Sequence, residues 1–186
     1  MDLGPVDRIT ADAVGEPGDR TFYLQIRASG ELVTIIVEKQ QVQLLAASIL
    51  ELLADVTLET GADLDEAGLE LEEPLDPRWR AGRLSLGYDR EQDVFLLEVT
   101  EFDPREDDDD EVDEDDEEAS DVLRGLLDHE PETVRLLATR EQMLALSRHG
   151  AEVAERGRPT CQFCGNPIDP EGHACPAMNG HSAVRD

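Results

Sequence analysis

Three cysteines and one histidine near the C-terminus constrain this chain more than any other feature. All three cysteines of the 186 residues lie within fifteen positions, as Cys161, Cys164 and Cys175, and His173 stands two residues before the last of them. Thiolate and imidazole suit a tetrahedral zinc ion, and four protein ligands leave no open position on the metal. The spacing therefore predicts a structural site for one zinc ion, held by Cys161, Cys164, His173 and Cys175.

The residues around these ligands favour two turns that face each other. In the Cys-x-x-Cys-Gly segment that ends at Gly165, two intervening residues bring both sulfurs to one side of a tight turn. The glycine lets the chain leave that turn with positive φ. His173 and Cys175 are expected on the same side of an extended segment, because side chains alternate along a strand. His173 is the least usual ligand, since one residue separates it from Cys175, and Asp169 and His181 are its substitutes.

The cysteines have two alternative interpretations. The first is a disulfide or redox pair between Cys161 and Cys164, with Cys175 left over. Redox pairs of this spacing usually open a helix after a strand, whereas Gly165 and Pro167 follow here and favour turns. The second is a zinc deaminase, whose His-x-Glu and Pro-Cys-x-x-Cys pair is not met by this sequence.

The composition favours an acidic protein with few aromatic side chains. Aromatic residues make up 4% of the chain, so leucine, valine, isoleucine and alanine must build the core. The net charge of −29 predicts repulsion from nucleic-acid phosphates and from anionic lipid surfaces. No apolar run of membrane-spanning length and no secretory signal are found, and clustered metal-type cysteines fit a reducing compartment. We therefore expect a cytoplasmic protein without a membrane span.

Hydrophobic periodicity predicts an α+β fold. Alternating or continuous apolar runs indicate strands, and apolar stripes at three- and four-residue steps indicate helices. One helix carries the stripe from Val42 to Val56, and a second is opened by the capping box from Thr139 to Gln142. The predicted strands cover residues 6–14, 21–28, 32–37, 78–88, 94–102 and 133–138. We expect an antiparallel sheet of about six strands with two packed helices and a zinc-ribbon-like C-terminal tail.

The two halves of the chain are alike. Each gives three strands followed by a helix, and residues 38–45 resemble residues 139–146 at the start of the two helices. This pattern suggests a pseudo-duplicated β-β-β-α unit.

An acidic run separates the predicted strands of the second half. From Glu106 to Glu118, twelve of thirteen residues are acidic, and their repulsion predicts disorder. The run would be a mimic of nucleic acid, a docking strip for a basic partner, or simply a solvated insert. We expect one α+β domain formed by residues 1–102 and 131–158, a disordered acidic insert at 103–121 and a zinc-binding tail at 159–186.

Three segments together resemble a family of actinobacterial proteins known only as a domain of unknown function. They are Gly15–Phe22, Glu38–Val42 and the Cys-x-x-Cys-Gly-x-Pro-x-Asp-Pro-x-Gly-His-x-Cys-Pro motif that begins at Cys161. The resemblance covers nearly the whole chain and implies a cytoplasmic protein in which His173 is grouped with the three cysteines. It implies no activity. The acidic run is longer than the family pattern leads us to expect.

These observations together predict a non-enzymatic zinc-binding protein that serves as a protein-protein interaction or adaptor module, with a basic protein as the preferred partner. The sequence contains no phosphate-binding glycine loop, no Gly-x-Ser-x-Gly and no His-Glu-x-x-His. Direct binding to nucleic acid or membranes is not expected. From Thr133 onward six arginines face six acidic residues, so a zinc-ribbon protein associated with the transcription or nucleic-acid machinery is one alternative. An enzyme of unknown reaction is the other.

Overall fold

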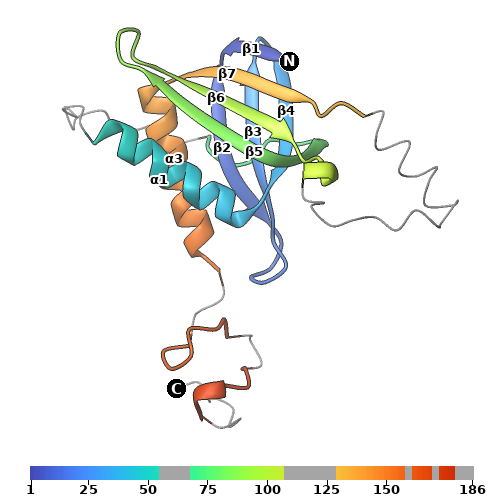
Figure 1. Cartoon of the computed structure of the whole chain (residues 1–186), viewed down its shortest axis with the longest axis vertical. Coiled ribbons are helices and arrows are strands. Elements are labelled where there is room, and N and C mark those ends of the chain that lie inside the picture. The colour runs from blue at the N-terminus through green and yellow to red at the C-terminus, as the bar shows by residue number, and fades with distance from the viewer. Residues whose placement is uncertain (55–67, 107–128, 158–160, 169–171, 179–186) are drawn as a thin grey trace, which may run out of the picture.

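The computed structural model describes residues 1–54, 68–106, 129–157, 161–168 and 172–178 (Figure 1). Within these residues the fold is α+β, with two α-helices beside a mixed sheet of seven strands. The elements in chain order are β1 (Asp2–Pro5), β2 (Arg8–Val14), β3 (Thr21–Ala28), β4 (Glu31–Val37), α1 (Lys39–Leu53), β5 (Pro77–Asp89), β6 (Val94–Glu101), a 3₁₀ turn η1 (Pro104–Glu106), β7 (Thr133–Thr139), α3 (Arg140–Glu155) and a 3₁₀ turn η2 (Pro176–Met178).

The sheet has the strand order β1-β7-β6-β5-β4-β3-β2 and contains two parallel pairs, β1 with β7 and β4 with β5. The expectation of a purely antiparallel sheet of about six strands is therefore wrong. Between β4 and β5 the chain passes through α1, so a crossover that contains a helix joins these two parallel strands. The seventh strand, β1, was not predicted because four residues that include Gly4 and Pro5 carry no alternating pattern.

The two ends of this strand order are consecutive along the chain. Only Val6 and Asp7 separate β1 from β2, and the chain changes partner between them. The amide of Val6 donates to the carbonyl of Leu137 in β7 at 2.9 Å, and the amide of Asp7 donates to the carbonyl of Arg27 in β3 at 2.8 Å. The bent segment formed by β1 and β2 therefore joins the first strand of the order to the last, and the sheet curls round on itself (Figure 1).

The second half of the chain repeats the pairing of the first. β2, β3 and β4 form one antiparallel group that leads into α1, and β5, β6 and β7 form another that leads into α3. The register agrees as well. Phe22 is paired with Val37, and Phe95 is paired with Ala138. Val37 and Ala138 each lie one residue before the N-cap of the helix that follows. The long strand β5 also bends, since its first residues pair with β4 in parallel and the rest with β6.

A glutamine in the first turn of each helix fastens that helix to the opposite half. Gln142 Nε2 donates to the carbonyls of Val6 and Asp7, at 2.9 and 3.2 Å. Gln41 Nε2 donates in the same way to the carbonyls of Ala81 and Gly82, at 3.2 and 3.1 Å. Gln142 of α3 thus holds the bend between β1 and β2, and Gln41 of α1 holds the bend of β5, so each helix is fastened to a strand of the other half. The similarity of residues 38–45 and 139–146 has this physical basis.

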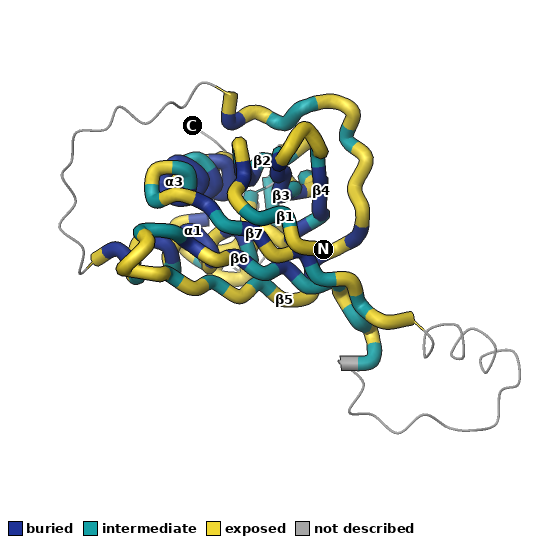
Figure 2. Tube along the Cα trace, turned by 90° about the horizontal axis from the view of Figure 1, so that it is seen from above, coloured by how far each residue is buried: buried dark blue, intermediate teal, exposed yellow. Residues whose placement is uncertain are grey.

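The core lies between the strands and the two helices, where buried residues gather in Figure 2. Phe95, Leu97 and Val99 of β6 are fully buried, as is Ile26 of β3. The helices also touch each other, since Ser147 Oγ donates to the carbonyl of Ala46 at 3.0 Å. The predicted apolar faces are confirmed within the described residues: Val42, Leu45, Ala46, Ile49 and Leu53 in α1, and Met143, Leu146, Gly150 and Val153 in α3 are buried.

The polar face of β3 is covered, which its alternating sequence does not indicate. Gln25 is fully buried because the segment before β5 lies over it, and its side chain exchanges two hydrogen bonds with the backbone of Glu72. The Glu72 carboxylate also pairs with Arg8 and Arg27. Burial of an amide group without hydrogen-bond partners costs free energy, and the backbone of Glu72 supplies these partners to Gln25.

Two predicted features fall outside the described residues. Val56, the last member of the first apolar stripe, lies beyond the end of α1, and residues 107–118 of the acidic run are likewise not described. The disorder of that run and the domain boundaries at 103–121 stay predictions.

Candidate metal centre

The Cys-x-x-Cys-Gly segment forms a closed turn beyond the end of α3 (Figure 1). The amide of Gly165 donates to the carbonyl of Cys161, and the amide of Cys161 donates to the carbonyl of Asn166, both at 2.8 Å. Gly165 has a φ of 73°, which residues with a side chain adopt at a cost. The expected positive φ is confirmed, and it turns the chain so that Cys161 and Cys164 lie on one side.

The second pair of predicted ligands faces this turn. Cys175 Sγ lies 3.8 Å from Cys161 Sγ, and His173 Nε2 lies 3.2 Å from Cys164 Sγ. All four candidate ligand atoms are within 4.8 Å of one another. The structure therefore brings together every residue that the sequence selected for the metal site. The substitutes Asp169 and His181 lie outside the described residues.

These distances fit a tetrahedral ion. A regular tetrahedron with metal–sulfur bonds of about 2.3 Å has a sulfur–sulfur edge of about 3.8 Å, which is the observed separation of Cys161 and Cys175. A disulfide would require a sulfur separation of about 2 Å, and all three cysteines are free. The group Cys161, Cys164, His173 and Cys175 could hold a metal ion.

Backbone hydrogen bonds favour the thiolate form of Cys161, and they outweigh the effect of burial, which raises the pKa of a thiol. Cys161 and Cys175 are 4% and 0% exposed, whereas Cys164 and His173 are half-buried. The amide of Phe163 donates to Cys161 Sγ at 3.4 Å. This hydrogen bond, followed by one from the amide of Cys164, lowers the pKa of the Cys161 thiol. The deprotonated sulfur is the form that binds a metal.

His173 presents its two ring nitrogens to different surroundings. Nε2 is directed at Cys164, while Nδ1 is buried without a hydrogen-bond partner among the described residues. A metal-bound histidine usually donates its second ring N–H to an acceptor. Nε2 is therefore the nitrogen that can serve as the fourth ligand, and the described part of the chain supplies no acceptor for Nδ1.

The fold and the site together define a class: an α+β protein with a curled mixed sheet and a C-terminal group of three cysteines and one histidine able to hold a metal ion. A sequence model described as "Protein of unknown function (DUF3090)" matches residues 1–175, and the chain belongs to this family. The match spans both the sheet-and-helix domain and the four candidate ligands. The resemblance to a domain of unknown function is thereby confirmed.

Comparison with the curated proteins and with the solved structures gave no match. No helix among the described residues combines the length and apolar character that crossing a membrane requires.

Proposed function

We propose that this protein is a non-catalytic zinc-binding protein, in which one structural zinc ion holds the C-terminal tail as a surface for a protein partner. The observation that carries the proposal is that four ligand atoms lie within 4.8 Å of one another, from four residues that are buried or half-buried. Three sulfurs and one nitrogen match the ligand sets of structural zinc sites.

The donor set favours zinc over the other biological divalent ions. Thiolate ligands exclude magnesium and calcium, which prefer oxygen, and a tetrahedral arrangement of sulfur and imidazole suits zinc. Four protein ligands occupy every position of a tetrahedral ion, so no place is left for a reacting water or substrate. This is the reason for proposing a structural role over a catalytic one.

A tail of this length needs such an ion in order to fold. A segment of fewer than about 40 residues rarely buries enough apolar surface to hold its own structure. Structural zinc supplies about 10–16 kcal/mol of apparent binding free energy in small zinc-finger peptides, which exceeds the stability of most domains. The turn at Gly165 and the segment that carries His173 are thereby fixed relative to each other.

The tail also offers an anchor for a partner. Phe163 lies between the two cysteines of the turn, and 68% of its side chain is exposed. Aromatic side chains are enriched in protein interfaces, and an exposed one on a rigid turn is ordered at little entropic cost. The chain carries 45 acidic residues against 16 basic ones, which favours a basic partner and disfavours direct contact with nucleic-acid phosphates.

Three variants of the full chain test the two parts of this proposal separately. Extended X-ray absorption fine structure at the zinc edge should show three sulfur ligands and one nitrogen ligand in the wild type and in Phe163→Ser. It should show a changed ligand set in Cys175→Ser. Partner proteins cross-linked in lysate should be recovered with the wild type and with the control Gln162→Ala, which changes an exposed neighbour in the same turn. They should be lost with Phe163→Ser and Cys175→Ser. A zinc with a bound water would refute the structural role, and recovery of the same partners by Phe163→Ser would refute the proposed surface.

A further inference from the structure

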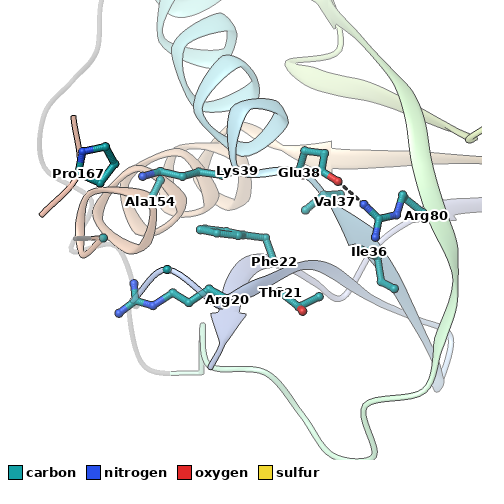
Figure 3. A pocket seen from close by; sticks show the side chains of 12 residues that line it. Arg20, Thr21, Phe22, Ile36, Val37, Glu38, Lys39, Arg80, Ala154 and Pro167 are labelled. Atoms are coloured by element: carbon teal, nitrogen blue, oxygen red, sulfur yellow. Dashed lines mark hydrogen bonds and ion pairs between the residues drawn. The ribbon is translucent and has the colours of Figure 1, made fainter. Parts of the chain in front are cut away.

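A cavity of about 440 Å³ lies between the N-terminal end of α1 and the C-terminal end of α3 (Figure 3). Phe22, Ile36, Val37 and Ala154 give it an apolar lining, and Pro167 of the tail also lines it. This volume is in the range of about 300–1,000 Å³ that is typical of small-molecule sites. The zinc ligands are not part of the lining, so the cavity is distinct from the candidate metal centre.

Three cationic side chains line the cavity. They are Arg20, Lys39 and Arg80, and the only acidic side chain in the lining is that of Glu38. Glu38 pairs with Arg80, whereas neither Arg20 nor Lys39 has an acidic partner among the residues that the structure describes. Three cations against one carboxylate leave a local charge of about +2. The charge of the lining is therefore opposite in sign to the net charge of −29 of the whole chain.

Lys39 is the only lysine of the chain, and the other fifteen of its 16 lysine and arginine residues are arginines. It is the first residue of α1, where the partial positive charge of the helix N-terminus adds to its own. Its ammonium lies close to Gly157, because a Cβ built on Gly157 would be 3.2 Å from Lys39 Nζ. A compact ammonium with three donors binds a phosphate group as a point charge, whereas arginine binds it bidentately through its planar fork.

The arrangement of the side chains separates a charged part from an apolar part. In Figure 3, Lys39 lies above and Arg20 below the level of the Phe22 ring, and both side chains extend to the same side of the view. Phe22 is 7% exposed, so its ring is packed into the wall and presents only a small part of its surface to the cavity. A ligand that places an anion between Arg20 and Lys39 would bring its body against the exposed part of this ring.

We propose that this cavity binds a small organic phosphate monoester whose body is aromatic or otherwise apolar. A phosphate monoester carries a charge of about −1.5 to −2 at neutral pH, which matches the excess positive charge of the lining, whereas a carboxylate supplies only one negative charge. Arg20 and Lys39 bind the phosphate oxygens, and Phe22 with its apolar neighbours contacts the body. Arg80 remains paired with Glu38.

The single lysine allows a selective measurement on the intact protein. Labelling with [15N]lysine gives one backbone amide resonance, that of Lys39, which can be followed while phenyl phosphate, inorganic phosphate, benzoate or phenol is added. We expect phenyl phosphate to shift this resonance in a saturable way, with an affinity at least about ten-fold higher than that of each of the other three compounds. An unmoved resonance at about 10 mM phenyl phosphate would overturn the proposal, as would equal affinity for benzoate.

Variants separate a built site from general attraction of anions. Arg20→Gln should weaken phenyl phosphate binding about ten-fold, and calorimetry should show a similar loss for Lys39→Gln. The matched control is Arg148→Gln, which removes an exposed cation of α3 that does not line the cavity. It should leave the affinity unchanged within about two-fold. Equal losses in Arg20→Gln and Arg148→Gln, with both variants folded by circular dichroism, would show that only net charge matters and would refute the site.

Discussion

Gln142 and its counterpart Gln41 are expected to contribute more to stability than the other glutamines of the two helices. Its side chain accepts a hydrogen bond from the amide of Thr139 at 2.9 Å and donates to the carbonyls of Val6 and Asp7. Each hydrogen bond contributes about 0.5–1.5 kcal/mol net. Gln142→Ala removes three of them, so it should lower the free energy of unfolding by about 2–3 kcal/mol.

A glutamate at this position divides that loss into two parts. Gln142→Glu keeps an oxygen that can accept from Thr139, as in the usual capping box, but it cannot donate to the two strand carbonyls while it is ionised. It should therefore cost about 2 kcal/mol at neutral pH, and Gln41→Ala should cost a similar amount because Gln41 makes the equivalent contacts. Gln43→Ala, an exposed position of α1, serves as the control and should stay within about 0.5 kcal/mol.

Urea unfolding of the full chain under reducing conditions measures these differences, with the fluorescence of Trp79, the only tryptophan, and far-ultraviolet circular dichroism as probes. The two probes should give the same midpoint. A Gln142→Ala variant as stable as Gln43→Ala would refute the idea that these glutamines fasten the bends of the sheet. A large loss at Gln142 with none at Gln41 would refute the equivalence of the two halves.

Two further predictions concern a carboxylate and a glycine. Hydrogen bonds from Arg105 lower the pKa of Asp103 from 3.8 to about 2, so its carboxylate stabilises the fold above about pH 4, and this contribution is lost as the pH falls through 2. Asp103→Asn should therefore show a stability deficit that closes between pH 4 and pH 2 in urea unfolding, and a deficit independent of pH would contradict this assignment. Gly15 has a φ of 114°, and a Cβ there would overlap the backbone carbonyl of Asp19, whereas a Cβ on Gly30 at φ 84° meets nothing within 4 Å. Gly30→Ala should lower the free energy of unfolding by about 1–2 kcal/mol, the cost of a left-handed backbone conformation in a residue with a side chain. Gly15→Ala should lower the melting temperature clearly more than Gly30→Ala does. The reverse order would show that the turn at Gly15 relaxes freely.

The elements with regular periodicity were predictable from the sequence. The alternation of Phe22, Leu24 and Ile26 gave β3 with its observed bounds, and the capping box at Thr139 placed the start of α3. Local sequence patterns determine which face of an element is buried, so these predictions needed no knowledge of the rest of the molecule. The same is true of the metal site, because Cys161, Cys164, His173 and Cys175 lie close together along the chain and reach each other through local turns.

What the sequence did not reveal depends on contacts between distant segments. The parallel pairing of β1 with β7 joins residues more than a hundred positions apart, and nothing in Asp2–Pro5 marks it as a strand. The burial of Gln25 arises from a segment that lies nearly fifty residues later. The cavity was also missed, because Arg20, Lys39 and Arg80 come from three separate segments that only the fold brings together.

The zinc content of the full chain tests the central claim most directly. We predict one zinc ion per chain, measured by inductively coupled plasma mass spectrometry, after purification under reducing conditions without added metal. The double variant Cys161→Ser with Cys175→Ser should retain less than about a tenth of that amount, because the remaining two ligands cannot hold the ion. Wild-type protein free of zinc, or a double variant that keeps a full equivalent, would contradict the assignment of Cys161, Cys164, His173 and Cys175 as a structural zinc site.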